Sequence, residues 1–307
     1  MNLLHEWPLV LFTLTVQLAV GLHLALLAAE ALPRQEDPGE PPGFRGRPFL
    51  LVGVLMAGAL VISLLHLGAP VNALRTLSNL DESWLSREIL AALVFLGLWG
   101  LDFGIRRRWE AVAPERPGPE PESPPGPAPG VSRVLAWATA LAGLVLIWVM
   151  ARIYMVPARP LWDHWLTAAG FFLTTFLLGA VVAAVHVVRR SPSGTPAQPA
   201  LPPKGAALLA LGVTVALAQM AATLAHPVTL EVATDPQGTP LVALRLGLLL
   251  AGAFLLVIPL AASAFPKLSS AGASRPGRWA AAALLLLGGS EVLGRMLFYA
   301  AGVSTPF

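Results

Sequence analysis

Long apolar stretches alternate with short polar connections along the whole chain of 307 residues. An α-helix needs roughly 20 apolar residues to cross the ~30 Å hydrocarbon core of a bilayer. Eight stretches approach or exceed this length, at residues 9–32, 49–67, 89–105, 134–154, 165–188, 206–225, 241–265 and 279–303. The pattern predicts an all-α, polytopic integral membrane bundle of eight transmembrane helices, forming a single transmembrane domain over residues 1–307. The third stretch is the shortest and contains Asp102, so seven spans is the alternative, with the termini on opposite sides.

Composition agrees with a membrane protein. The chain is 56% hydrophobic and only 12% charged, whereas soluble domains usually carry about 25% charged residues. It contains no cysteine, so cysteine-ligated iron–sulfur clusters and cysteine zinc sites within this chain are excluded. A metal would need histidine or carboxylate ligands, and no motif for metal or nucleic-acid binding is present. The amino terminus lacks a basic segment and a cleavage signal, which indicates the mature start rather than a signal peptide.

Lysine and arginine gather in alternate connections. The first, third, fifth and seventh connections hold most of them: Arg34, Arg45, Arg47, Arg106, Arg107, Arg108, Arg116, Arg133, Arg189, Arg190, Lys204, Lys267, Arg275 and Arg278. Basic residues favour the cytoplasmic side of a membrane. The pattern therefore predicts cytoplasmic odd-numbered connections and both termini on the outer side of the cell inner (cytoplasmic) membrane.

The two sets of connections differ in composition. The predicted cytoplasmic segments near residues 33–48, 107–132 and 189–204 are rich in proline and are typical of solvated linkers. The outer connections mix tryptophan, charge and turn residues. We therefore expect a partner protein to dock on the outer face.

Polar residues also gather near the outer ends of the predicted spans. His66 ends the second span and Glu88 opens the third. Charged groups in a membrane are costly and usually functional. A quinol loses two protons when it loses two electrons, so its site needs a histidine that accepts a proton near neutral pH and a carboxylate that passes it on. His66 and Glu88 therefore suggest quinol oxidation near the outer interface.

Structural explanations compete with this hypothesis. His66 can bond the last free carbonyls of its helix, and Glu88 follows Ser86, a candidate N-cap, so it can interact with the helix dipole. Glu291 and Arg295 are four residues apart and are expected to pair with each other.

Other polar residues and the overall architecture allow three further interpretations. Arg152 and Arg245 can extend to the interface. Histidines at matching depth, His23 with His186 or His66 with His226, would allow a haem-bearing quinol cytochrome of the b type. A small-solute transporter is a further alternative, although the inverted repeats and broken helices typical of transporters are not evident.

Nine short segments, in order from residue 5 to 299, carry a resemblance to a known family. They are HEWPL at 5–9, SLLHLGAP at 63–70, LSNL at 77–80, LSREI at 85–89, RIY at 152–154, PLW at 160–162, GFFLT at 170–174, EVLGR at 291–295 and FY at 298–299. Together they resemble the membrane-anchor subunit of the anaerobic dimethyl sulfoxide reductase family, the DmsC-like proteins. Arg87 stands where a small polar residue is expected, and the sixth and seventh spans match only in hydrophobicity.

The resemblance implies a specific role. It implies an eight-span, haem-free anchor that binds menaquinol near the outer face and does not itself reduce the terminal acceptor. Electrons would pass to an iron–sulfur subunit and then to a molybdopterin catalytic subunit, both on the outer face. By position, His66 matches the quinol-site histidine and Glu88 its nearby carboxylate. Arg75, Arg152 and Arg295 are shared positions that we expect to contribute to the quinol site.

Overall fold

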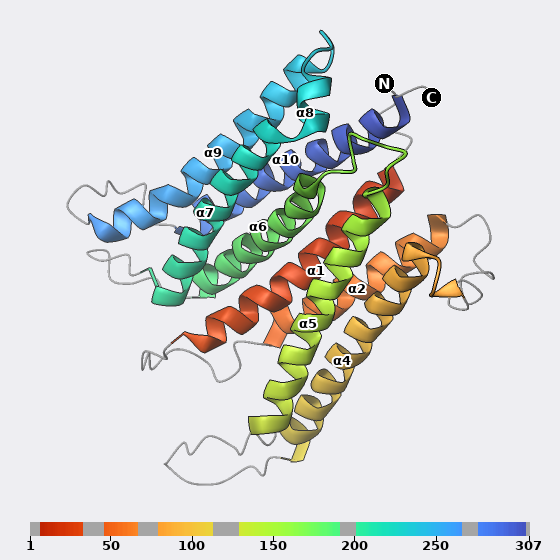
Figure 1. Cartoon of the computed structure of the whole chain (residues 1–307). Helices are drawn as coiled ribbons and strands as arrows, with labels where there is room; N and C mark the ends of the chain where they lie inside the picture. The colour runs from red at the N-terminus through yellow and green to blue at the C-terminus, as the bar shows by residue number, and fades with distance from the viewer. Residues whose placement is uncertain are drawn as a thin grey trace.

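A computed structural model describes residues 7–32, 46–66, 79–112, 129–190, 201–265 and 276–304. Eight helices in these ranges are long and apolar enough to cross a membrane, which confirms the predicted span count. They are α1 (Trp7–Ala31), α2 (Gly46–His66), α4 (Trp84–Val112), α5 (Pro129–Tyr154), α6 (Trp165–Arg190), α7 (Pro203–Ala225), α9 (Thr239–Ala264) and α10 (Pro276–Ser304). A short helix, α8 (Pro227–Val232), connects α7 to α9. Figure 1 shows the start of α1 and the end of α10 at the α8 end of the bundle.

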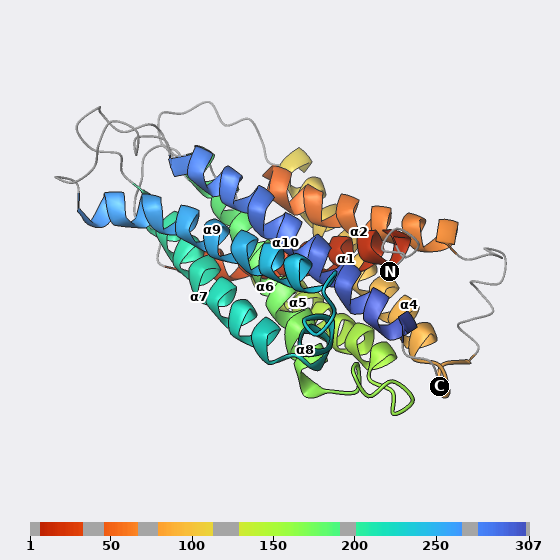
Figure 2. The ribbon, with the colours of Figure 1, turned by 90° about the horizontal axis from the view of Figure 1, so that it is seen from above.

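Two central helices organise the bundle. α1 and α6 have the largest buried fractions and pack against each other, with α2, α4 and α5 on one side and α7, α9 and α10 on the other (Figures 1 and 2). A Cβ added to Gly21 would lie 1.9 Å from the carbonyl oxygen of Thr175, and one added to Gly179 would lie 2.1 Å from the Gly21 carbonyl carbon. Small residues let membrane helices approach this closely, so the glycine pair sets the α1–α6 crossing.

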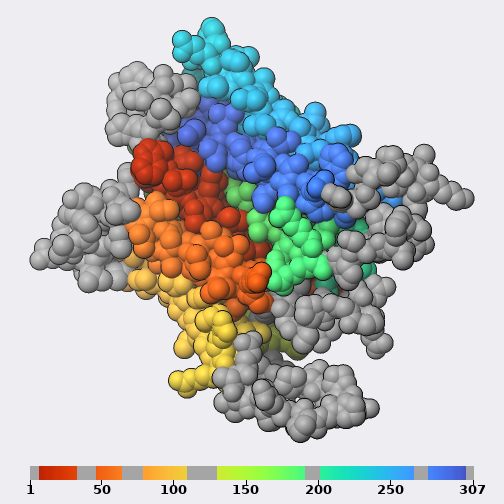
Figure 3. All heavy atoms as spheres, turned by 180° about the vertical axis from the view of Figure 1, so that it is seen from behind, coloured from red at the N-terminus to blue at the C-terminus, as the bar shows by residue number. Residues whose placement is uncertain are grey.

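The periphery of the bundle is apolar. Exposed side chains include Trp137, Phe254 and Leu285, of which Leu285 is 78% exposed. On the face shown in Figure 3, α2, α1 and α10 lie side by side. Such a surface fits lipid and not water. The structure therefore supports a multi-pass membrane protein.

The third span differs from its predicted bounds because Asp102 has local partners. α4 begins before residue 89 and continues past residue 105 to Val112. The buried carboxylate of Asp102 accepts hydrogen bonds from Arg106 Nε at 2.9 Å and from Ser132 Oγ of α5 at 2.5 Å. Paired in this way, the charge lies inside a helix without ending it. The neighbouring α5 begins at Pro129, so both helices extend into the predicted 107–132 connection.

Candidate functional site

Three of the five predicted quinol-site residues lie in the described part of the chain. Glu88, Arg152 and Arg295 are placed, whereas the side chain of His66 and all of Arg75 lie outside the described residues. His66 is the last residue of α2, and Glu88 lies in the second turn of α4. The predicted proximity of His66 and Glu88 at one end of the bundle stays a prediction.

Glu88 is buried, with 5% of its surface exposed. Its carboxyl group interacts electrostatically with Tyr154 of α5 and Tyr299 of α10. The helix cap differs from the predicted one, because Ser83 Oγ accepts the Ser86 backbone N–H at 3.2 Å, while Ser86 is buried inside α4. The side chain of Glu88 is therefore inside the bundle, within electrostatic range of two phenols.

Tyr154 and Tyr299 form a directed chain of hydroxyl groups. Their oxygens are 3.0 Å apart, and Tyr299 donates to Thr13 Oγ1 at 3.4 Å. Thr13 in turn donates to the Leu9 carbonyl at 2.8 Å. This order leaves Tyr154 as the donor to Tyr299, so the three hydroxyl groups form a chain that ends at a backbone carbonyl near the start of α1. The prediction from sequence gave neither tyrosine a role, although these are the only two in the chain and both lie in segments that carry the family resemblance.

Arg295 is held by partners on α1 and α6. Its Nη2 donates to Gln17 Oε1 at 3.0 Å, and Gln17 Nε2 donates to the Phe171 carbonyl at 2.9 Å. The guanidinium lies 3.8 Å from the ring centroid of Phe171 and 5.8 Å from that of Phe298. Stacking on an aromatic face stabilises a buried cation. Arg295 and the two rings thus form a wall inside the bundle.

The expected Glu291–Arg295 pair is wrong, because each residue has a tertiary partner. Glu291 is 3% exposed, and its Oε2 accepts from Thr174 Oγ1 at 2.5 Å and from Gln219 Nε2 at 3.2 Å. No Glu291–Arg295 ion pair forms in the described structure. The carboxylate instead joins α6, α7 and α10, and its Oε1 has no hydrogen-bond partner among the described residues.

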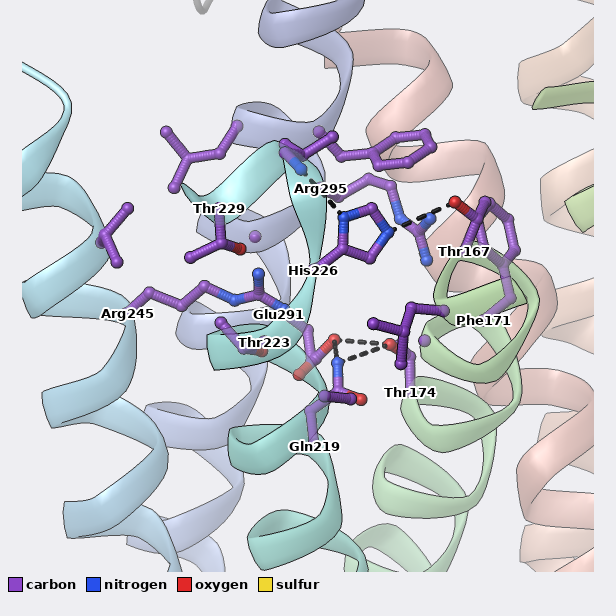
Figure 4. Close-up of a pocket in the computed structure, with 18 of the residues that line it drawn as sticks. Thr167, Phe171, Thr174, Gln219, Thr223, His226, Thr229, Arg245, Glu291 and Arg295 are labelled. Carbon is purple, nitrogen blue, oxygen red and sulfur yellow. Dashed lines mark hydrogen bonds between the residues drawn. The ribbon is translucent and has the colours of Figure 1, made fainter. Parts of the chain in front are cut away.

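The side chains of Arg245 and Arg152, which were both expected to extend to the membrane interface, have different neighbours. Arg245 extends from α9 towards α10, where a Cβ on Gly294 would lie 2.4 Å from its guanidinium carbon (Figure 4). The Arg245 side chain therefore points into the bundle, and the expectation that it extends to the membrane interface is wrong. Arg152 is different, because its guanidinium lies 5.3 Å from the centroid of Trp84 at the start of α4.

His226 is fixed as a neutral ring between α7 and α8. Its Nδ1 accepts the Val228 backbone N–H at 3.2 Å, so the ring proton is on Nε2, which lies 3.2 Å from Thr167 Oγ1. Thr167 donates onward to the Trp162 carbonyl at 2.8 Å. Burial, followed by the positive charge of Arg245 and the neighbouring His164 and Arg295, lowers the pKa of His226 from 6.5 to about 4.

These groups surround one cavity of about 60 Å³. It lies between α6, α7, α8, α9 and α10, and Figure 4 shows Glu291, Gln219 and Thr174 at one end and His226 and Thr229 towards the other. The rings of Phe171 and Phe298 line this cavity and also pack against Tyr154, with ring centroids 5.6 and 5.5 Å apart. The end of the bundle therefore carries two polar groups of residues, the Glu88–tyrosine group and the cavity around Glu291.

Comparison with known proteins identifies the family. The anaerobic dimethyl sulfoxide reductase chain YnfH of Escherichia coli is 28% identical over 96% of this chain and 94% of its own length. The chains C of anaerobic dimethyl sulfoxide reductase from Haemophilus influenzae and E. coli are 29% and 27% identical, over 59% and 58% of this chain and 58% and 56% of their own lengths. No solved structure matches. Residues 1–108 and 128–301 match the family described as DMSO reductase anchor subunit (DmsC), and the chain belongs to this family.

Proposed function

We propose that this protein anchors a molybdoenzyme reductase complex in the cytoplasmic membrane and oxidises menaquinol at the α8 end of the bundle. The family supports the anchor role, and the relatives named as chains of an anaerobic reductase support a multisubunit complex. The observation that carries the quinol site is the burial of the Glu88 carboxyl group inside the bundle, within electrostatic range of the Tyr154–Tyr299 pair. A positioned carboxylate can take a proton from a neighbouring base and pass it on.

In the proposed reaction, the protons and the electrons of the quinol leave by different routes. A menaquinol loses two electrons and two protons to become a menaquinone. His66 accepts the two hydroxyl protons of the quinol one after the other, and Glu88 passes each of them towards water at the same end of the bundle. Both electrons leave for an iron–sulfur cluster of a partner subunit docked on this face, since the chain has no cysteine to bind a cluster of its own. A second partner, the molybdopterin subunit, receives these electrons and reduces the terminal acceptor.

The test uses the assembled complex in membranes. The variants His66→Ala and Glu88→Gln are compared with Glu82→Gln, which changes an exposed carboxylate next to the same helix start. We expect quinol-dependent reduction of the acceptor to fall about tenfold or more in the first two variants, within the usual range for removing a general acid or base. Reduction driven by a dye that donates directly to the partner subunits should stay at the wild-type rate in all three. Wild-type quinol oxidation in both site variants would refute the assignment.

A further inference from the structure

Four buried polar atoms in the cavity around Glu291 have no hydrogen-bond partner among the described residues. They are Glu291 Oε1, Gln219 Oε1, Thr223 Oγ1 and Arg245 Nε, contributed by α7, α9 and α10. Buried polar groups in native proteins almost always have partners, and exceptions usually mark an unseen water or ion. The gathering of four such atoms around one cavity therefore indicates that the cavity holds a ligand or water.

The volume of the cavity decides what that ligand is. A water molecule needs roughly 10–15 Å³ of such space, so about 60 Å³ accommodates about four. A quinol ring with its tail requires the several hundred Å³ typical of small-molecule sites. Three of the four unpaired atoms can accept hydrogen bonds, and one donates. Water serves both kinds of atom, whereas a metal cation would be repelled by Arg245 and Arg295.

Glu291 is surrounded by two cations and by several uncharged side chains. α9 contributes Arg245, α10 contributes Arg295, and the α7–α8 junction contributes the neutral His226. α6 and α7 contribute only the uncharged Thr174 and Gln219 beside the carboxylate. Glu291 is the only carboxylate that lines the cavity. A proton that enters along the waters therefore has one site at which to bind.

The cavity extends from the interior of the bundle to the helix α8. Its lining runs from Glu291, well inside α10, to Val228, Thr229 and Val232 on α8. Three residues of this six-residue helix therefore line the cavity at the α8 end of the bundle. We propose that the cavity is a water-filled proton inlet from the α8 end of the bundle that ends at Glu291. It is separate from the Glu88 group and does not depend on the quinol proposal.

The chain offers a direct test, because it contains no cysteine. Gln219→Cys would place a thiol in the inlet, and Leu217→Cys would place one on the exposed, lipid-facing side of the same helix (Leu217 is 49% exposed). Thr223→Cys is a second inlet position. The assembled complex in membranes is treated with the silver ion, a small hydrophilic thiol reagent, then denatured and labelled with a maleimide to count unreacted thiols.

Only a thiol in contact with water ionises and reacts quickly. We expect silver to block Gln219→Cys and Thr223→Cys about tenfold or more faster than Leu217→Cys. Equal rates at the inlet and lipid-facing positions would overturn the water-filled cavity. Infrared spectra of the complex in D₂O test the proton site itself: a pH-dependent carboxyl band should be absent from Glu291→Gln and present in Glu88→Gln. If Glu291→Gln removes no titrating band, the inlet does not end at an exchanging carboxylate.

Discussion

Replacing His226 with asparagine removes a titrating ring and keeps the hydrogen bond that begins α8. Asparagine is a good N-cap and can accept the Val228 N–H through its side-chain oxygen. At neutral pH both side chains are uncharged. The two proteins should therefore be equally stable near pH 7 and diverge only where histidine takes up a proton.

The size of the divergence follows from proton linkage. Unfolded His226 titrates near 6.5 and folded His226 at about 4, because burial and the nearby Arg245 oppose its charge. Between these values the unfolded chain binds more protons, so the free energy of unfolding falls as the pH falls. At ~1.4 kcal/mol per pKa unit, the wild type loses about 2 kcal/mol by about pH 5 and about 3 kcal/mol by about pH 4. These are upper values, because the ring is only partly buried and water screens its charge.

Thermal unfolding of the detergent-purified chain across this pH range measures the effect. A loss of about 2 kcal/mol corresponds to roughly 3 °C in Tm for a chain of 307 residues. We expect the Tm of the wild type to drop below that of His226→Asn by up to this amount near pH 5, with no difference near pH 7. Parallel Tm profiles for the two proteins would show that His226 is not held neutral by its surroundings, and the described hydrogen-bond pattern around the ring would then be wrong.

Two packing predictions use the same unfolding assay. Gly21→Ala should destabilise the chain by about 1–3 kcal/mol, because its Cβ would collide with the backbone oxygen of Thr175 and force α1 and α6 apart; Gly97→Ala, with open space around it, is the control and should be neutral or slightly stabilising. A neutral Gly21→Ala would contradict the close α1–α6 crossing. Asp102→Leu should cost about 1–3 kcal/mol by leaving the buried Ser132 hydroxyl unpaired. Adding Ser132→Ala should recover part of that loss, and additive costs would exclude the coupling.

The sequence was sufficient for the span count because a bilayer constrains the chain so strongly. Backbone groups in lipid must be bonded within helices, so apolar length alone identifies each crossing. Asp102 shows where this reasoning fails at the level of boundaries. Its partner Arg106 is visible in sequence as a residue four positions later, but Ser132 comes from another helix, and only the fold brings them together. The predicted third span was therefore too short although its existence was right.

The same limit applies to the candidate site: the sequence predicts how deep a residue lies in the membrane, but not which residues of other helices it contacts. Span positions placed His66 and Glu88 near one membrane face from charge and hydrophobicity alone, and they could not reveal Tyr154 and Tyr299, which meet across α5 and α10. The Glu291–Arg295 prediction failed for a related reason. Spacing of four residues makes pairing possible on an isolated helix and is worth only ~0.2–0.5 kcal/mol there. Inside the bundle Glu291 obtains two hydrogen bonds from α6 and α7, and Arg295 obtains Gln17 and the face of Phe171.

Separating Glu291 from Arg295 has a functional consequence. A direct pair would have joined the two charges and satisfied Glu291 Oε1, which would remove the reason for water in the cavity. Arg295 instead turns towards Gln17 of α1 and the Phe171 ring, and it still lines the cavity. The two buried carboxylates, Glu88 and Glu291, therefore have different surroundings: Glu291 lines the cavity together with Arg295, and Glu88 does not.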